Sequence, residues 1–229
     1  AQGWAIVIAL PLMVALALWR VDEPRRRVQP AGSDATLADY FRLLRRPTVV
    51  RILTADLLMG LAPNVAGALF FFYFLRIKAF DRIEASALLL IYFLAAIAGA
   101  VLWTRLARRY GKSRTLIISC VLYAAVQFGV PLLPSGNFLL AIPFLVAAGI
   151  PYSAAPTLLR AMMADFADEE RLVTGADRTG LLFAILTGTV KIGAALAASS
   201  FIVLGALGFN AQDPAQSSEA SMIGLQALY

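Results

Sequence analysis

Long apolar segments dominate this chain and restrict what it can fold into. A membrane-spanning helix needs roughly 20 apolar residues. Segments of about that length occupy residues 2–19, 49–75, 85–106, 115–133, 138–160 and 178–208, and a seventh apolar segment starts near residue 220. No alternating strand pattern competes with these segments. The sequence therefore predicts an all-α membrane protein that crosses the bilayer several times.

The positive charges are distributed unevenly among the segments that connect these spans. Sixteen of the 20 Lys and Arg residues lie in or beside three alternate connectors, at residues 20–48, 107–114 and 163–177. Cytoplasmic loops of membrane proteins carry such an excess. We therefore expect these connectors to be cytoplasmic, in a cell (inner) membrane, with Trp103 as an anchor at the bilayer interface. The net charge of +6 then reflects orientation in the lipid bilayer, and we expect no nucleic-acid partner.

The composition also restricts the chemistry that this chain can perform. It contains no histidine and a single cysteine, Cys120. These counts exclude Ser-His-Asp and Cys-His catalysis, histidine metal ligands and an internal disulfide within the chain. A metal held by Asp165, Asp168 and Glu169 is the remaining enzymatic alternative, but the other cytoplasmic connectors offer arginine in place of a second acidic cluster. We expect neither an enzyme nor a resident cofactor or metal.

A lysine, Lys191, lies inside the last long apolar segment. It lies about 20 Å along a helix that starts at Arg178, which is close to the middle of the membrane. Insertion of a charged side chain at that depth costs roughly 2.5–3.5 kcal/mol of free energy. Small residues, among them Thr187, share its side of the helix, and the bulky residues within two turns point elsewhere. We expect Lys191 and Thr187 to face an aqueous pathway. Pairing of the lysine with a carboxylate for packing alone is the alternative.

Other polar candidates for this pathway accompany prolines. Asp56 and Asn64 belong to the second span, where Pro63 frees a backbone carbonyl and bends the helix. Tyr152 lies in "IPFLVAAGIPYSAAP", and broken helices near the midplane often form transporter sites. The alternatives are a pairing of Asp56 with Arg51 or a connector arginine, and a kink that serves packing only.

Several motifs resemble one family of transporters. "MADFADEERLVTGADRTG" resembles the AD-x-x-D…TG-x-R-x-x-G signature of the glycoside–pentoside–hexuronide:cation symporters, which are melibiose-permease-like members of the major facilitator superfamily. "LWTRLARRYGKSRTL" resembles the W-x-x-L-A-x-R-x-G-K-x-R segment of that family. "VKIGAALA" around Lys191, and Asn64 followed by "FFFYF", resemble its eleventh and seventh helices. The matches cover about residues 50–205, in the family's order.

The resemblance implies a major-facilitator-type helical bundle, specifically a C-terminal six-helix half truncated at both ends. Residues 1–19 would end the sixth helix, residues 20–48 would form the central cytoplasmic connector, and residues 49–229 would hold helices seven to eleven and the start of helix twelve. The missing N-terminal half would carry most of the carboxylates for a coupling cation, Na⁺ or H⁺. The implied cytoplasmic gate comprises Asp165, Asp168, Arg178, Arg108 and Arg109.

The implied function is cation-coupled symport of a sugar or glycoside by alternating access, and we expect the fragment not to transport by itself. One alternative within the superfamily is carriage of a lipid-like or other non-sugar anion, whose acidic group Lys191 would bind. Alternatives from other classes are the carboxylate–metal membrane enzyme described above and a receptor or scaffold that transports nothing.

Overall fold

The computed structural model describes residues 2–20, 37–210 and 217–229. The chain divides into two compact units, Ala1–Asp34 and Ala35–Tyr229. The first unit contributes the apolar helix α1 (Gln2–Arg20), which contains Pro11 and whose side chains from residue 7 onward are exposed. Much of the expected central connector, residues 21–36, lies outside the described part of the chain.

The second unit is built from helices joined by short turns. In chain order these are α2 (Leu37–Leu44), α3 (Pro47–Phe72), a π-helical turn η1 (Tyr73–Ile77), α4 (Arg82–Tyr110), α5 (Lys112–Gly129), a 3₁₀ turn η2 (Val130–Leu132), α6 (Phe138–Tyr152), α7 (Ala154–Thr174), α8 (Thr179–Ala206) and α9 (Glu219–Leu228). Within the described ranges, five helical segments are long and apolar enough to cross a membrane: 47–77, 82–110, 112–132, 138–174 and 179–206. The prediction of an all-α, multi-pass membrane protein is confirmed.

The helices extend further than the apolar segments predicted. Most of residues 107–114 and 163–177, which we expected as connectors between the spans, is helical. Charged residues such as Glu, Lys and Arg are good helix formers, so the helices continue past the apolar stretch. They end where glycine takes a backbone conformation with positive φ, at Gly111 (φ 86°) and Gly175 (φ 71°).

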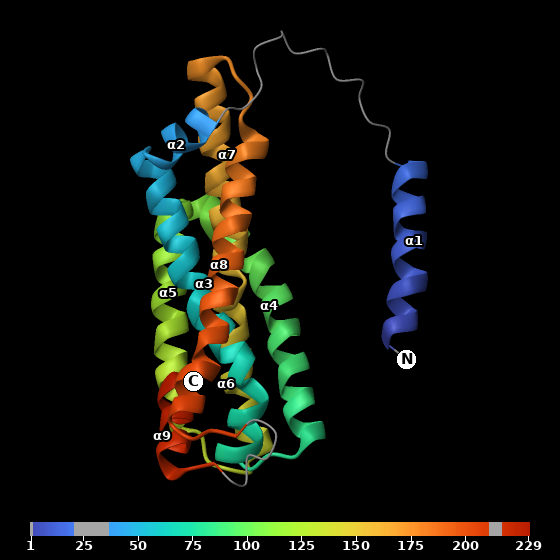
Figure 1. Cartoon of the computed structure of the whole chain (residues 1–229), viewed down its shortest axis with the longest axis vertical. Helices are drawn as coiled ribbons and strands as arrows, with labels where there is room; N and C mark the ends of the chain where they lie inside the picture. The colour runs from blue at the N-terminus through green and yellow to red at the C-terminus, as the bar shows by residue number, and fades with distance from the viewer. Residues whose placement is uncertain (1, 21–36, 211–216) are drawn as a thin grey trace. The chain divides into compact units, whose positions relative to one another are not determined.

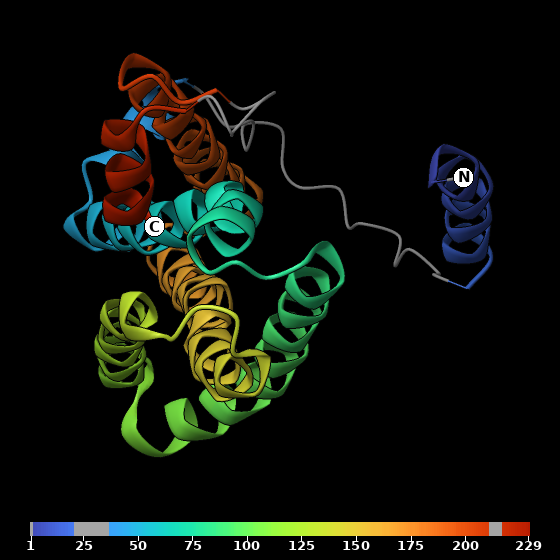
Figure 2. The same cartoon turned by 90° about the horizontal axis from the view of Figure 1, so that it is seen from below.

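The other four long segments pack around α7. In Figure 2, where the bundle is viewed along its helices, α7 lies between α3 and α8 on one side and α4 and α5 on the other, and it contacts all four. The most extensive helix pairs are α4 with α6 and α3 with α8. Helix α2 and the C-terminal end of α7 lie at the same end of the bundle (Figure 1), which we call the basic end.

Helices α4 and α6 cross in close backbone contact. A Cβ atom at Gly149 would lie 2.2 Å from the Tyr92 carbonyl oxygen, and one at Gly99 would lie 2.4 Å from the Ile150 carbonyl oxygen. Trp103 is 2% exposed and its indole Nε1–H donates to the same Ile150 carbonyl at 2.7 Å. The prediction that Trp103 is an interfacial anchor is therefore wrong, because the helix break after α6 offers this carbonyl to a side-chain donor inside the bundle.

Two large apolar clusters lie toward opposite ends of the bundle. The cluster at the basic end joins α2 to the long helices through residues such as Leu43, Val49, Trp103, Met163 and Leu182. The other cluster joins η1 to α4, η2 and α6, and its buried members include Phe70, Tyr73, Phe74, Leu88, Val130 and Leu145. Residues near the middle of the spans line the cavities described below.

At the end opposite to the basic end, a buried lysine joins two helix ends. Lys78 is 4% exposed, and its Nζ donates to the carbonyl oxygens of Pro131 (2.8 Å) and Leu133 (2.7 Å). It also lies 5.7 Å from the centre of the Tyr73 ring. Since those carbonyls terminate the helical segment of α5 and η2, the ammonium group supplies donors that a helix C-terminus lacks.

Replacement of Lys78 by methionine should destabilise the fold by about 1–3 kcal/mol, because it leaves two carbonyl oxygens without a donor. Burial lowers the pKa of Lys78 below its ordinary value of 10.5. The folded state then binds fewer protons than the unfolded state, so stability of the wild type should rise as the pH increases through the lowered pKa toward 10.5. Thermal unfolding between pH 8 and 10 should show this rise in the wild type, and equal slopes in the two proteins would contradict the prediction.

Candidate functional site

Three neighbouring cavities lie near the middle of the spans, and Pro63 and Tyr152 line all of them. The aromatic cavity, of about 230 Å³, lies among α3, α4, α5, α6 and the C-terminal Tyr229. The apolar cavity, of about 410 Å³, lies among α3, α5, α9 and the α6–α7 break. The polar cavity, of about 150 Å³, lies among α3, α8 and the same break. The helix break therefore contributes to every one of these spaces.

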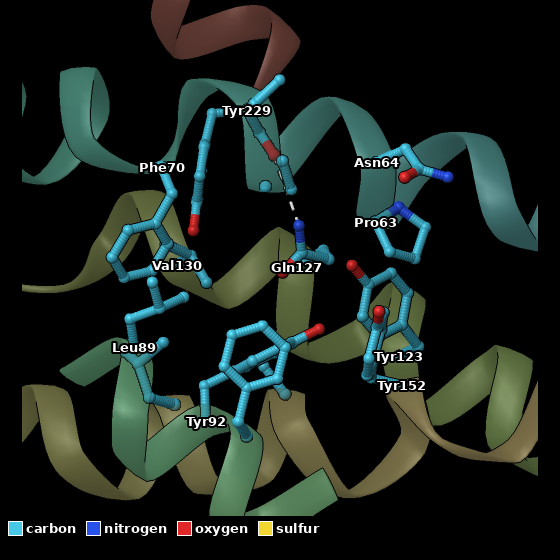
Figure 3. A pocket seen from close by; sticks show the side chains of 16 residues that line it. Pro63, Asn64, Phe70, Leu89, Tyr92, Tyr123, Gln127, Val130, Tyr152 and Tyr229 are labelled. Carbon is cyan, nitrogen blue, oxygen red and sulfur yellow. Dashed lines mark hydrogen bonds between the residues drawn. The ribbon is translucent and has the colours of Figure 1, made fainter. Parts of the chain in front are cut away.

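Tyrosine side chains from four parts of the chain surround the aromatic cavity. Tyr92, Tyr123, Tyr152 and Tyr229 all line it (Figure 3). The rings of Tyr92 and Tyr152 lie 5.3 Å apart between centroids. The amide of Gln127 donates from Nε2 to the Tyr229 carbonyl oxygen at 3.3 Å, which orients its side chain at the cavity wall. The cavity thus combines flat apolar rings with hydroxyl and amide groups.

The polar cavity brings together three residues that the sequence analysis selected, Asp56, Asn64 and Tyr152. The Asn64 Nδ2 group donates to the Gly60 carbonyl oxygen at 2.8 Å. From α8, Thr189 also lines the cavity, and its hydroxyl donates to the Ile185 carbonyl oxygen at 3.2 Å. Asp56 is only 9% exposed, and its Oδ2 atom is buried without a hydrogen-bond partner among the described residues.

Lys191 and Thr187 do not join these residues. Both are exposed on α8, and neither lines the three central cavities. The hydroxyl of Thr187 donates to the Phe183 carbonyl oxygen at 2.8 Å. Gly193 of the same helix packs against α3, where a Cβ atom added to the glycine would lie 3.7 Å from the Leu57 Cδ1 atom. Among the residues that the structure describes, no carboxylate pairs with Lys191, so the packing alternative finds no partner there.

Ion pairs connect the helices at the basic end. Lys112 lies 2.5 Å from Asp165 and also donates to the Ala161 carbonyl oxygen at 3.1 Å. Glu170, which is 5% exposed, lies between Arg46 (3.4 Å) and Arg178 (3.5 Å). This carboxylate therefore links the start of α3, the end of α7 and the start of α8.

The residues of the implied gate occupy this basic end but differ in their contacts. Asp165 pairs with Lys112, and Arg178 pairs with Glu170. Asp168, Arg108 and Arg109 are exposed. No ion pair joins those three to other side chains in the described ranges.

Sequence reasoning missed several residues of the site. Tyr92, Tyr123, Gln127 and Thr189 line the cavities, and Glu170 forms the buried ion pairs. The signal that could have found the first four is their polar atoms within apolar spans, where such groups are costly and often functional. Glu170 could not be separated from its acidic neighbours by sequence alone.

The carboxylates of the described residues do not gather as a metal-binding cluster would. Across residues 2–20, 37–210 and 217–229, no group of three His, Cys, Asp or Glu side chains is placed to hold an ion. Asp165, one of the three residues in the enzymatic alternative, is already paired with Lys112.

Comparison with known proteins identifies the family. The chain is 30% identical over 168 residues to a protein of Pseudescherichia vulneris described as "Uncharacterized 29.9 kDa protein in crtE 3'region"; the match covers 71% of this chain and 59% of that relative. A family profile described as MFS/sugar transport protein matches residues 2–229. With its membrane-spanning helices and central cavities, the chain belongs to the MFS/sugar transport protein family.

Proposed function

We propose that the protein is a secondary active transporter that carries a sugar or glycoside together with a cation by alternating access. Membership of a transport family supports the general class. The choice of a sugar as cargo rests on one observation: tyrosine rings lie together with amide and hydroxyl groups around the aromatic and polar cavities. The apolar faces of a sugar ring pack against aromatic rings, and its hydroxyls need such convergent hydrogen-bonding groups.

The proposed pathway runs between this bundle and a second bundle of the complete transporter. In this proposal residues 1–19 end the sixth helix, residues 20–48 connect the two halves, and residues 49–229 form most of the second half. Lys191 faces the other half across the pathway, where its charge responds to the coupling cation. The basic end faces the cytoplasm of a cell whose inner membrane holds the protein, as the excess of Lys and Arg favours.

Alternating access also requires contacts that form in one state and break in the other. The pairs of Asp165 with Lys112 and of Arg178 with Glu170 supply candidates at the cytoplasmic end. Arg108, Arg109 and Asp168 are exposed there and are available to contact the other half in the closed state. These five predicted gate residues would then act with Lys112 and Glu170.

The test is uptake by vesicles that contain the complete protein. We expect at least one radiolabelled sugar or glycoside, from a panel of galactosides, glucosides and pentosides, to accumulate when a Na⁺ or proton gradient is imposed. Collapse of the gradient by an ionophore should stop accumulation. Absence of gradient-driven uptake across the panel, from protein that is folded and correctly inserted, would contradict the proposal.

A second candidate is carriage of a lipid-like or other anion. It is favoured by the exposed ammonium of Lys191, which lacks an acidic partner in the part of the chain that the structure describes. Labelled lysophospholipid in the same vesicles separates the two candidates. Transport of that anion, lost in Lys191→Met and retained in Lys191→Arg, with no sugar uptake, would replace the first proposal.

A further inference from the structure

The polar cavity contains a carboxylate oxygen that the described protein groups leave unsatisfied. Asp56 is nine-tenths buried, about a third of the way along the span Pro47–Ile77 from the basic end, and no hydrogen-bond donor among the described residues reaches its Oδ2 atom. A buried ionised carboxylate without a partner is strongly unfavourable. A ligand that supplies positive charge would resolve this mismatch.

The groups around Asp56 match the ligands of a hard monovalent cation. The amide nitrogen of Asn64 donates a hydrogen bond to the Gly60 carbonyl oxygen, so the side-chain oxygen of Asn64 is left to accept or to bind a cation. Thr189 adds a hydroxyl oxygen at the cavity wall. Proline has no backbone N–H to donate to the carbonyl oxygen four residues earlier in a helix. Pro63 therefore leaves the Met59 carbonyl without this helical hydrogen bond, and Pro156 does the same for the Tyr152 carbonyl. Met59 and Tyr152 both line the cavity. The cavity therefore offers oxygen ligands of the kind that hard cations prefer.

Unwound backbone carbonyls next to helix breaks coordinate Na⁺ in transporters. The polar cavity lies beside the interruption at Ser153 between α6 and α7, and its volume of about 150 Å³ has room for an ion with water ligands. We propose that the polar cavity is a Na⁺ site in which Asp56 provides the charged ligand and Thr189 and Asn64 provide neutral ones. Its role in coupling rests on the proposed function, whereas the binding itself does not.

The charged side chains of the surrounding helices do not fill the site. Arg160 of α7 is the cation whose charge acts on Asp56, but it is exposed and does not hydrogen-bond to the buried Oδ2 atom. Arg51 of α3 is exposed as well, and Lys191 of α8 does not line the cavity. One other explanation is long-range pairing of Asp56 with Arg160 for stability alone, and a variant of Arg160 tests it.

The position of the site suggests how ion and cargo communicate. Pro63, Asn64 and Tyr152 line both the polar cavity and the aromatic cavity. A cation at Asp56 would fix these shared side chains in one arrangement before a sugar binds beside them. The resemblance placed the coupling carboxylates mainly in the other half, so this site would add a cation-binding position to the half described by this structure.

The experiment is a Na⁺ titration of the melting temperature of the complete, purified protein in detergent. Choline chloride keeps the ionic strength constant, the pH is fixed, and KCl serves as the comparison salt. We expect a saturable rise in melting temperature with Na⁺. Thr189→Val should raise the half-saturating Na⁺ concentration about tenfold, Asp56→Asn should remove the Asp56-dependent part of the rise, and Arg160→Gln should leave the half-saturating concentration unchanged.

Other outcomes would overturn the site. An unchanged Na⁺ response in both Asp56→Asn and Thr189→Val would place the ion elsewhere. Loss of the response in Arg160→Gln as well would assign Asp56 to a structural pair. A stabilisation that follows acidification and not Na⁺ would make the ligand a proton. Circular dichroism and gel filtration check that each variant is folded.

The result is independent of the cargo. Asp56-dependent Na⁺ binding without sugar uptake would support the site and contradict the proposed function. Sugar uptake, together with a Na⁺-dependent rise in melting temperature that is unchanged in Asp56→Asn and Thr189→Val, would support the function and contradict the site.

Discussion

Gly149→Ala should destabilise the bundle by about 3 kcal/mol, the upper end of the range for overpacking. The added Cβ atom would lie 2.2 Å from the Tyr92 carbonyl oxygen and 3.0 Å from the Ala95 Cβ atom. Both neighbours belong to α4 and one is backbone, so the helices must separate. Separation would also strain the nearby hydrogen bond from Trp103 to Ile150. Alanine favours helix by about 1 kcal/mol over glycine, which makes a loss of stability informative.

Gly188→Ala is the matched control, because an added Cβ atom there has no neighbour within 4 Å. It should keep or slightly raise the melting temperature of the purified protein. The measurement is thermal unfolding of both variants in the same detergent. Equal melting temperatures for Gly149→Ala and Gly188→Ala would show that α4 and α6 do not cross as closely as described.

Tyr152→Ala should reduce transport more than any other single change in the cavity walls. The ring lines all three cavities and lies 5.3 Å from the ring of Tyr92. Its removal merges the spaces and deletes an aromatic surface for the sugar. We expect the half-saturating sugar concentration to rise about tenfold or more, which corresponds to about 1.4 kcal/mol of binding free energy.

Tyr152→Phe separates the two parts of this effect. It keeps the ring and removes the hydroxyl, so the half-saturating concentration should rise by only about twofold to tenfold, the range for one hydrogen bond. Ile83→Ala, at an exposed position of α4 away from the cavities, is a control for general effects on expression and insertion. Unchanged uptake kinetics in Tyr152→Ala would exclude the aromatic cavity as the cargo site.

The sequence predicted those features that depend on local hydropathy and helix period. The spans agree with the observed helices because a run of apolar residues determines burial in the bilayer wherever the neighbours lie. The 100° helical rotation also groups small residues on the side of Lys191, whereas the pathway that this side is expected to face stays a prediction. Prolines nearby, or a polar side chain within an apolar segment, indicated Asp56, Asn64 and Tyr152 as candidates. The structure places all three at one cavity.

The features that were missed depend on tertiary packing. Trp103 looks like an interfacial anchor until α6 brings the Ile150 carbonyl within 2.7 Å of its indole nitrogen. Tyr92 and Tyr123 belong to different helices, α4 and α5, and line one cavity because both helices pack against α6. Asp165 and Asp168 lie in α7 since the helix continues to Gly175, beyond the apolar segment that set the predicted boundary.

In the proposed mechanism, water and cargo reach the middle of this bundle, at Asn64 and along the face of Lys191. Its most direct test is the reaction rate of a membrane-impermeant thiol reagent with single cysteines in the complete protein, in a Cys120→Ser background. Val121→Cys, on an exposed apolar face of α5, is the control. We expect Asn64→Cys and Lys191→Cys to react, a transported sugar to slow the reaction at Asn64→Cys, and Val121→Cys to stay unreactive. Reaction at Lys191→Cys and Asn64→Cys no faster than at Val121→Cys would contradict it.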